Sequence, residues 1–372
     1  MLAWRNLVHD KIRLAVTVTG IVFAVVLIVV ELGLFIGFTT TTSSLIDQSG
    51  ADLWISARNV PFIEQGTPFS ERKLSTVMAT PGVAAASKYV LRFAEWKRPD
   101  GGQDSVLVVG FDLQTRLGAP WNIIAGQVDD LRQPDAVFID DIYRERLGAA
   151  RVGQVVEVQG RRARIAGFTQ GIRAFTTSPY VFTRFKAAQN YTVLREDETV
   201  YLLVKAKPNV DVEGLRRRLA ARLPSIDVMT TAEFSRRTRL FWMFTTGAGL
   251  AVLLAAVLGL VVGIVIVAQT IYATTVDHIR EYATLKAIGA SNWYLYKVIV
   301  LQAVISALIG YALGIVIAVL VIRGSKESGA AILLPPGMVA GMLVLTLVMC
   351  VSAAIFSIRK VTRLDPALVF KG

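Results

Sequence analysis

Four long apolar runs constrain the fold of this 372-residue chain more than any other feature. They occupy residues 14–38, 241–271, 296–322 and 335–357. Each is long enough for a helix to cross the hydrocarbon core of a bilayer, which needs roughly 20 residues. The first run is about twice as long as the core of a signal peptide and no clear cleavage site follows it, so we expect a retained anchor. The pattern therefore predicts a membrane protein with four transmembrane helices.

A polar block, residues 39–240, separates the first two runs and is long enough for one or two small domains. Segments rich in β-branched and aromatic residues predict strands, and two segments with capping residues predict helices. The expected strands are 51–57, 83–96, 105–111, 136–140, 153–159, 161–169 and 199–206. The expected helices are 70–79, capped by Ser70, and 211–222, capped by Asp211. Asp100-Gly101-Gly102 predicts a hairpin turn.

The basic residues of the short segments predict the orientation of the chain. Ten lie beside the runs on one side, against only Arg323 and Lys326 in the loop 323–334. The ten are Arg5, Lys11, Arg13, Arg280, Lys286, Lys297, Arg359, Lys360, Arg363 and Lys371. Because Lys and Arg accumulate on the cytoplasmic side, both termini are expected in the cytoplasm of a multi-pass membrane protein. The expected fold class is thus membrane α-helical, with a large α+β extracytoplasmic domain between helices 1 and 2.

The expected organisation of the chain follows from these boundaries. Residues 1–13 mix apolar and basic side chains and predict an amphipathic elbow helix in the inner headgroup layer. The remaining segments are helix 1 (14–38), the outer domain (39–240), helix 2 (241–271), a cytoplasmic coupling segment (272–295), helix 3 (296–322), an outer loop (323–334), helix 4 (335–357) and a cytoplasmic tail (358–372).

Composition excludes several classes of function. The net charge of +12 does not indicate nucleic-acid binding, because the outer block mixes both signs and its basic residues form no stripe. Attraction to anionic lipid headgroups explains the cytoplasmic charges. The sequence has no P-loop motif, two histidines (His9 and His278) and one cysteine (Cys350). We therefore expect no catalytic residue, no metal site and no cofactor in this chain.

A short charged segment, residues 277–291, lies between the second and third runs, where it has no core of its own to fill. Residues 280–290 read REYATLKAIGA, which resembles the REIATLKAIGAS-like signature of the FtsX/MacB-type permeases of ABC transporters. Tyr282 departs from it, since an aliphatic residue is usual there. Residues 3–7 (AWRNL) with Arg13, and residues 363–367 (RLDPA), resemble the conserved beginning and end of the same family.

A narrower resemblance concerns the outer block. The segments ADLWI (51–55), PGV (81–83), FAEWK (93–97) and VGFD (109–112) are similar to the DevC branch of these permeases. That branch is associated with an HlyD-like membrane fusion protein and a TolC-like outer-membrane channel. The resemblance implies an exporter subunit in the bacterial inner membrane that works by mechanotransmission.

The same resemblance implies the partners and the coupling site. Two copies of the chain would pair with two copies of an ABC ATPase, which would hold ATP and Mg²⁺. The coupling residues would be Arg280, Glu281, Tyr282, Leu285, Lys286, Ile288 and Gly289. ATP-driven dimerisation of the ATPases would tilt the helices and move the outer domains, and substrate would enter from the outer side. The alternatives are an FtsX-like regulator of a cell-wall hydrolase and a lipoprotein-release permease. The sequence does not identify a substrate.

Three residues in the apolar runs have two interpretations each. Glu31 lies near the outer end of helix 1, either as a hydrated interfacial carboxylate or as a contact for substrate or a second copy. Gly259 and Gly263 form a small-xxx-small pair that allows close helix contact, including contact across a dimer, although glycines are common in such helices. Trp54, Trp96 and Trp121 are expected in the core of the outer domain, with an adaptor-docking surface as the alternative.

Overall fold

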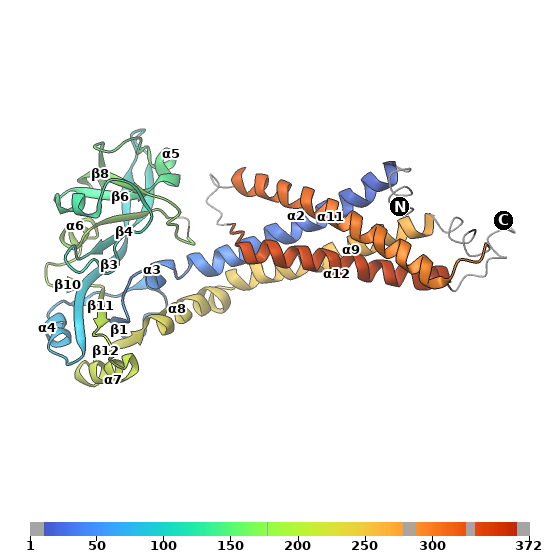
Figure 1. The fold of residues 1–372 in the computed structure, drawn as a ribbon. Helices are drawn as coiled ribbons and strands as arrows, with labels where there is room; N and C mark the ends of the chain where they lie inside the picture. The colour runs from blue at the N-terminus through green and yellow to red at the C-terminus, as the bar shows by residue number, and fades with distance from the viewer. Residues whose placement is uncertain (1–10, 177, 278–283, 285–287, 325–331, 363–372) are drawn as a thin grey trace. The chain divides into compact units, whose positions relative to one another are not determined.

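A computed structural model describes residues 11–176, 178–277, 284, 288–324 and 332–362 (Figure 1). The chain divides into two compact units. One is helical and is built from residues up to 37 and from 250 onward, and the other is an outer domain over residues 38–249. Residues 1–10 of the predicted elbow helix (1–13) lie outside the described residues. Residues 11–13 belong to the first membrane helix, which begins at Lys11.

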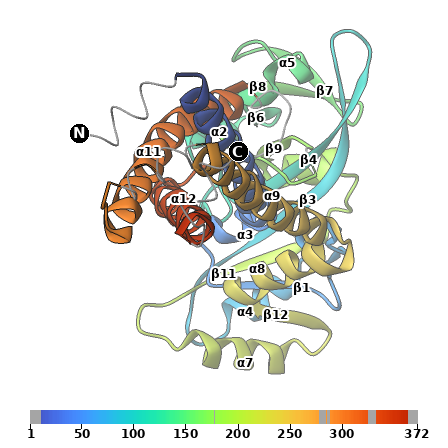
Figure 2. The ribbon, with the colours of Figure 1, turned by 90° about the vertical axis from the view of Figure 1, so that its right-hand side faces the viewer.

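The helical unit contains four long apolar helices among the described residues, as the four runs predicted. They are α2 (Lys11–Thr41), α9 (Ala248–Asp277), α11 (Asn292–Gly324) and α12 (Pro336–Thr362). Their apolar parts each suffice to cross a membrane: Leu14–Thr41, Ala248–Ala273, Asn292–Gly324 and Pro336–Phe356. Figure 2 views these helices nearly end-on. The second helix begins at Ala248 and not at Phe241, because a π-helix and a break precede it.

The outer domain is α+β, as expected, and is organised around a ten-stranded mixed sheet in the part of the chain that the structure describes. Nine strands follow in the order β12-β1-β11-β3-β4-β9-β6-β8-β5, and β7 pairs with β3 and β8. Their bounds are β1 Leu53–Ala57, β3 Val83–Lys97, β4 Gln103–Phe111, β5 Ile123–Ala125, β6 Ala136–Asp140, β7 Val155–Val158, β8 Arg161–Thr169, β9 Tyr180–Arg184, β11 Tyr201–Ala206 and β12 Ile226–Thr230. A two-stranded ribbon joins β2 (Phe69–Ser70) to β10 (Glu198–Thr199).

Short helices cover this sheet. They are α3 (Ser44–Asp47), α4 (Lys73–Met78), α5 (Arg144–Leu147), α6 (Phe185–Tyr191), α7 (Val212–Arg222) and α8 (Thr231–Leu240). The 3₁₀ turns are η1 (Ile63–Gln65), η2 (Val128–Arg132) and η3 (Asp141–Tyr143), and η4 (Phe241–Thr245) is a π-helix.

The alternation of side chains along β1 explains how the domain holds two cores. Leu53 and Ile55 point to one face of the sheet and join the cluster that includes Leu215 of α7. Trp54 points to the other face and joins the larger cluster with Phe234 of α8. The rings of Trp54 and Phe234 lie 5.4 Å apart between centroids. Both faces of the sheet are therefore buried at β1.

Several local predictions can be compared with the structure. Asp211 caps α7, as expected, because its carboxylate accepts hydrogen bonds from the backbone N–H groups of Glu213 and Gly214. The hairpin is also present, with Arg98 N–H donating to the carbonyl of Gly102 over 2.8 Å. Ser70 is not a helix cap: it pairs in β2, and α4 begins only at Lys73.

The tryptophans lie where the core prediction placed them. Trp54 and Trp96 are fully buried, and Trp121 is partly buried against the same core. The Trp96 indole N–H donates to the carbonyl of Leu147 over 2.9 Å.

Candidate functional site

The coupling segment connects α9 to α11, and the structure describes only part of it. Arg280, Glu281, Tyr282, Leu285 and Lys286 lie outside the described residues. Their predicted contact with an ATPase stays a prediction.

Two large apolar side chains are strongly exposed in the described part of the segment. Ile288 is 80% exposed. Trp293, which was not among the predicted coupling residues, is 77% exposed. Between them, Gly289 has φ +100° and turns the chain in the left-handed region that glycine favours. The hydroxyl of Ser291 accepts a hydrogen bond from Tyr294 N–H at the start of α11. The turn at Gly289 thus lies between two strongly exposed apolar side chains.

Helix α9 contacts α2 through the predicted glycine pair. Gly259 and Gly263 are both buried. A Cβ atom added at Gly259 would lie 3.1 Å from Cγ of Glu31, and one added at Gly263 would lie 2.8 Å from Cδ1 of Ile28. These glycines therefore allow two helices of the same chain to approach closely. Contact of Glu31, Gly259 and Gly263 with a second copy or with substrate stays a prediction.

Helix α11 approaches α2 in the same way. A Cβ atom at Gly310 would lie 2.5 Å from Cγ2 of Ile21, and one at Gly314 would lie 2.8 Å from Cγ1 of Val25. Two helices thus use glycines four residues apart to hold α2 between them. In agreement, 44% of the most apolar stretch of α2 is buried, against 22–33% of the corresponding stretches of the other three helices.

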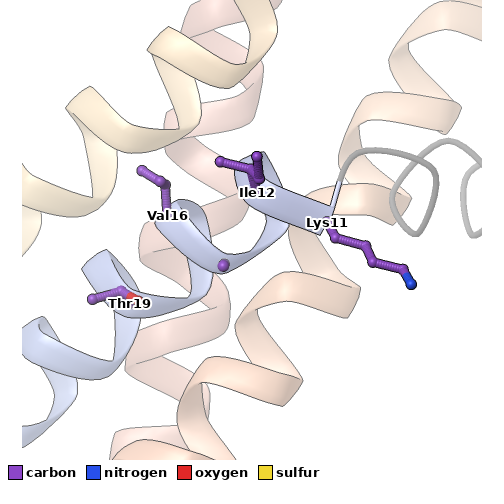
Figure 3. Close-up of a pocket in the computed structure, with 5 residues that line it drawn as sticks. Lys11, Ile12, Val16 and Thr19 are labelled. Atoms are coloured by element: carbon purple, nitrogen blue, oxygen red, sulfur yellow. The ribbon is translucent and has the colours of Figure 1, made fainter.

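One exposed face of α2 lies at its N-terminal end. A shallow pocket of about 470 Å³ is lined by Lys11, Ile12, Ala15, Val16 and Thr19 (Figure 3). All five residues belong to one helix, and Ile12 and Val16 are 79% and 62% exposed. This apolar face is available to lipid or to another helix.

A break in the helix precedes α9. Helix α8 is capped by Thr230 and Glu233, whose side chains each accept a hydrogen bond from the other's backbone N–H. It continues into the π-helix η4, and a break at Thr246 and Gly247 follows. Gly247 has φ +74°, and nothing lies within 4 Å of a Cβ atom added there. The backbone conformation alone therefore favours glycine at this position.

Comparison with known proteins identifies the family. The model of the MacB-like periplasmic core domain matches residues 14–222, and that of the FtsX-like permease C-terminal region matches residues 253–366. The chain belongs to the MacB/FtsX family of ABC transporter permeases. This permease is 25% identical over 381 residues to an uncharacterized ABC transporter permease of Mycobacterium tuberculosis, covering 100% of this chain and 99% of that protein. A second relative, from Mycobacterium bovis, is 23% identical over 373 residues, covering 99% and 97%.

Two solved structures are similar to about half of the permease. The periplasmic region of MacB from Actinobacillus actinomycetemcomitans aligns with a TM-score of 0.39 and 12% identity over 52% of this chain and 96% of that chain. The extracellular domain of YknZ, a noncanonic ABC-type transporter of Gram-positive bacteria, aligns with a TM-score of 0.37 and 11% identity over 48% and 98%.

Proposed function

We propose that this permease receives force from an ABC ATPase at its coupling segment and passes it to the outer domain to drive efflux. The observation that supports this most strongly is the connectivity of the two helices that hold α2. The coupling segment joins α9 directly to α11. These are the helices whose glycines contact α2, and α2 and α9 are the two chain connections to the outer domain. A displacement of the segment would therefore reach both connections.

The composition of the helical unit favours mechanical coupling over a polar path through the helices. Its buried polar side chains in the described region are few and uncharged, namely Thr17, Ser306 and Thr346. Thr346 is satisfied within its own helix, because its hydroxyl donates to the carbonyl of Met342. No Asp, Glu, Lys, Arg or His is buried in the described part of this unit, and Glu31 of α2 is only partly buried. Such residues line substrate paths in many membrane proteins. Substrate would thus be taken up from the outer side.

The proposed assembly contains two copies of the permease and two ATPase subunits in the inner membrane, with both termini in the cytoplasm. ATP and Mg²⁺ would bind to the ATPase subunits. Each ATPase needs its own coupling segment, and each permease chain carries one, which favours closed twofold symmetry. The exposed face of α2 around Ile12 and Val16 offers room for an apolar contact with the second copy. An HlyD-like adaptor and a TolC-like channel would complete an exporter, on the strength of the DevC-like motifs.

A charge reversal in the coupling segment tests the proposal. We expect Glu281→Lys to leave the permease in the membrane but to abolish export, while ATP hydrolysis by the co-purified ATPase continues. Full export by this variant at normal abundance would contradict the proposal. Activation of a cell-wall hydrolase by the wild-type complex without export would instead favour an FtsX-like regulator. Release of lipoproteins would favour a lipoprotein-release permease.

A further inference from the structure

An aromatic cluster surrounds the π-helix η4 in the outer domain. We define the stalk cluster as Phe38, Phe62, Phe175, Phe241 and Trp242. Phe62 stacks on Phe241 with 4.3 Å between ring centroids, and Phe175 meets Trp242 edge-on at 5.1 Å. Phe38, near the end of α2, contacts Phe175 at 4.5 Å. Four separate segments of the outer domain are therefore joined through these rings.

A buried carboxyl group lies beside this cluster. Glu64, in η1, is 7% exposed, and both of its carboxylate oxygens lack a hydrogen-bond partner among the described residues. The indole N–H of Trp242 is likewise buried without a partner in the described part of the chain. It lies near enough to stabilise the charged carboxylate but does not reach hydrogen-bond geometry. An unpartnered buried carboxyl group is rare in a native core and calls for an explanation.

The surroundings of Glu64 favour its neutral form. Burial raises its pKa from 4.5 to about 7, while its own backbone N–H and Trp242 act in the opposite direction. Among the described residues, the phenols of Tyr180 and Tyr201 lie near Glu64, since burial and the nearby carboxyl group both raise their pKa values. Burial also raises the pKa of Tyr89 in the same core. Arg237 of the adjoining helix α8 is held by Asp227 at 3.4 Å. No charged side chain in the described region compensates Glu64.

Neighbouring contacts hold η1 firmly against the sheet. The Tyr201 hydroxyl donates to the carbonyl of Ile63 over 2.7 Å. A Cβ atom added at Gly66 would lie 2.6 Å from that hydroxyl oxygen. Trp242 of η4 lies beside the same carboxyl group, so displacement of η4 would expose Glu64 to water.

We propose that Glu64 is a protonation-controlled latch that holds η4 against the body of the outer domain. With a neutral carboxyl group the stalk cluster stays closed over Glu64. With an ionised carboxylate the group needs water, and the state in which η4 has moved away gains population. Since η4 leads through Gly247 into α9, the latch would set how firmly the outer domain follows that helix. This inference rests on the geometry of the outer domain and does not require that the permease exports a substrate.

The sign and size of the effect follow from proton linkage. The closed state binds the proton more tightly, so acid favours it. Between pH 4.5 and about 7 the ratio of closed to open state falls about tenfold per pH unit, and above about pH 7 it levels off.

Hydrogen–deuterium exchange of the full-length permease in lipid nanodiscs tests the latch. After correction for intrinsic exchange rates, we expect the protection of residues 241–246 in the wild type to fall about 40-fold from pH 5 to pH 7. Glu64→Gln keeps the shape of the neutral carboxyl group, so the protection of residues 241–246 in this variant should stay nearly constant over this range. Glu157→Gln, a matched change of an exposed carboxylate paired with Lys97, should behave like the wild type.

A second variant keeps the latch testable if Glu64→Gln does not fold. Trp242→Phe preserves the ring cover but removes the N–H that favours the ionised form, so the loss of protection should extend to higher pH. Equal pH dependence in the wild type and Glu64→Gln would overturn the proposal. So would a wild-type segment whose corrected protection does not change with pH.

Discussion

Replacing Gly310 by alanine tests most sharply whether α2 is gripped by its neighbours. The added Cβ would lie 2.5 Å from Cγ2 and 2.7 Å from Cβ of Ile21. Carbon atoms in contact normally lie roughly 3.5–4.0 Å apart, so α11 and α2 would have to separate by about 1 Å. The atom in the way is close to the backbone and cannot rotate aside. Overfilling a close contact of this kind costs ~1–3 kcal/mol.

The only cysteine provides the assay. Cys350 is fully buried in α12, so its labelling by a thiol reagent during SDS titration reports unfolding of the helical unit. We expect Gly310→Ala to lower the unfolding free energy by ~1–3 kcal/mol. Gly341→Ala on α12 is the matched control, because nothing lies within 4 Å of a Cβ atom added there. It should be neutral or stabilising by up to ~1 kcal/mol. Identical titrations for the two variants would refute the claim that Gly310 allows α11 to pack closely against α2.

Three further predictions concern the break before α9, the N-terminal cap of α8 and the membrane topology. Gly247→Ala should destabilise the local structure by ~1–2 kcal/mol because φ is positive there, and amide exchange of residues 241–249 should become faster. Gly247→Asn should cost less, because asparagine tolerates that conformation. Thr230→Ala should destabilise the outer domain by about 1 kcal/mol in urea titrations, since it removes the acceptor for Glu233 N–H; an unchanged midpoint would argue against the capping box. In a Cys350→Ala background, Ser105→Cys should label with an impermeant thiol reagent in intact spheroplasts and Ser291→Cys only after lysis, and the opposite pattern would reverse the proposed orientation.

Long-range patterning in the sequence predicted the architecture well. Runs of about 20 or more apolar residues have few alternatives to a membrane helix, and all four appear as helices. The α+β class followed from strand-like segments such as 136–140 and 161–169, which are strands with those bounds. Asp211 was recognisable as a cap because its side chain acts within three residues of sequence.

Elements that depend on distant partners were missed. Strand β12 is short and carries Asp227, and it becomes a strand because it pairs with β1 more than 160 residues earlier. Helix α8 was missed although Thr230 and Glu233 form a recognisable capping-box pattern. The aromatic stretch 241–245 is apolar enough to resemble part of a membrane helix, but it packs as a π-helix within the outer domain.

The candidate site was only partly predictable for the same reason. Gly259 and Gly263 indicated close helix contact, but no local pattern indicates that α2 of the same chain is the neighbour. Glu64 gave no signal, since its burial arises from residues far away in sequence. Ile288 belonged to the recognised motif, whereas the exposure of Trp293 emerged only from the fold.

The central claim, that the coupling segment drives the outer domain, is tested most directly by distance measurements in the assembled transporter. Spin labels on Ser105→Cys in both copies of a Cys350→Ala permease would be followed by pulsed electron resonance, with and without trapped ATP. We expect the distance between the outer domains to change on ATP trapping, and Ile288→Asp, at an 80% exposed position, to abolish the change while the helical unit stays folded. The account would be contradicted by an unaltered ATP-dependent distance change in Ile288→Asp. Active export by the wild type without any change in this distance would contradict it as well.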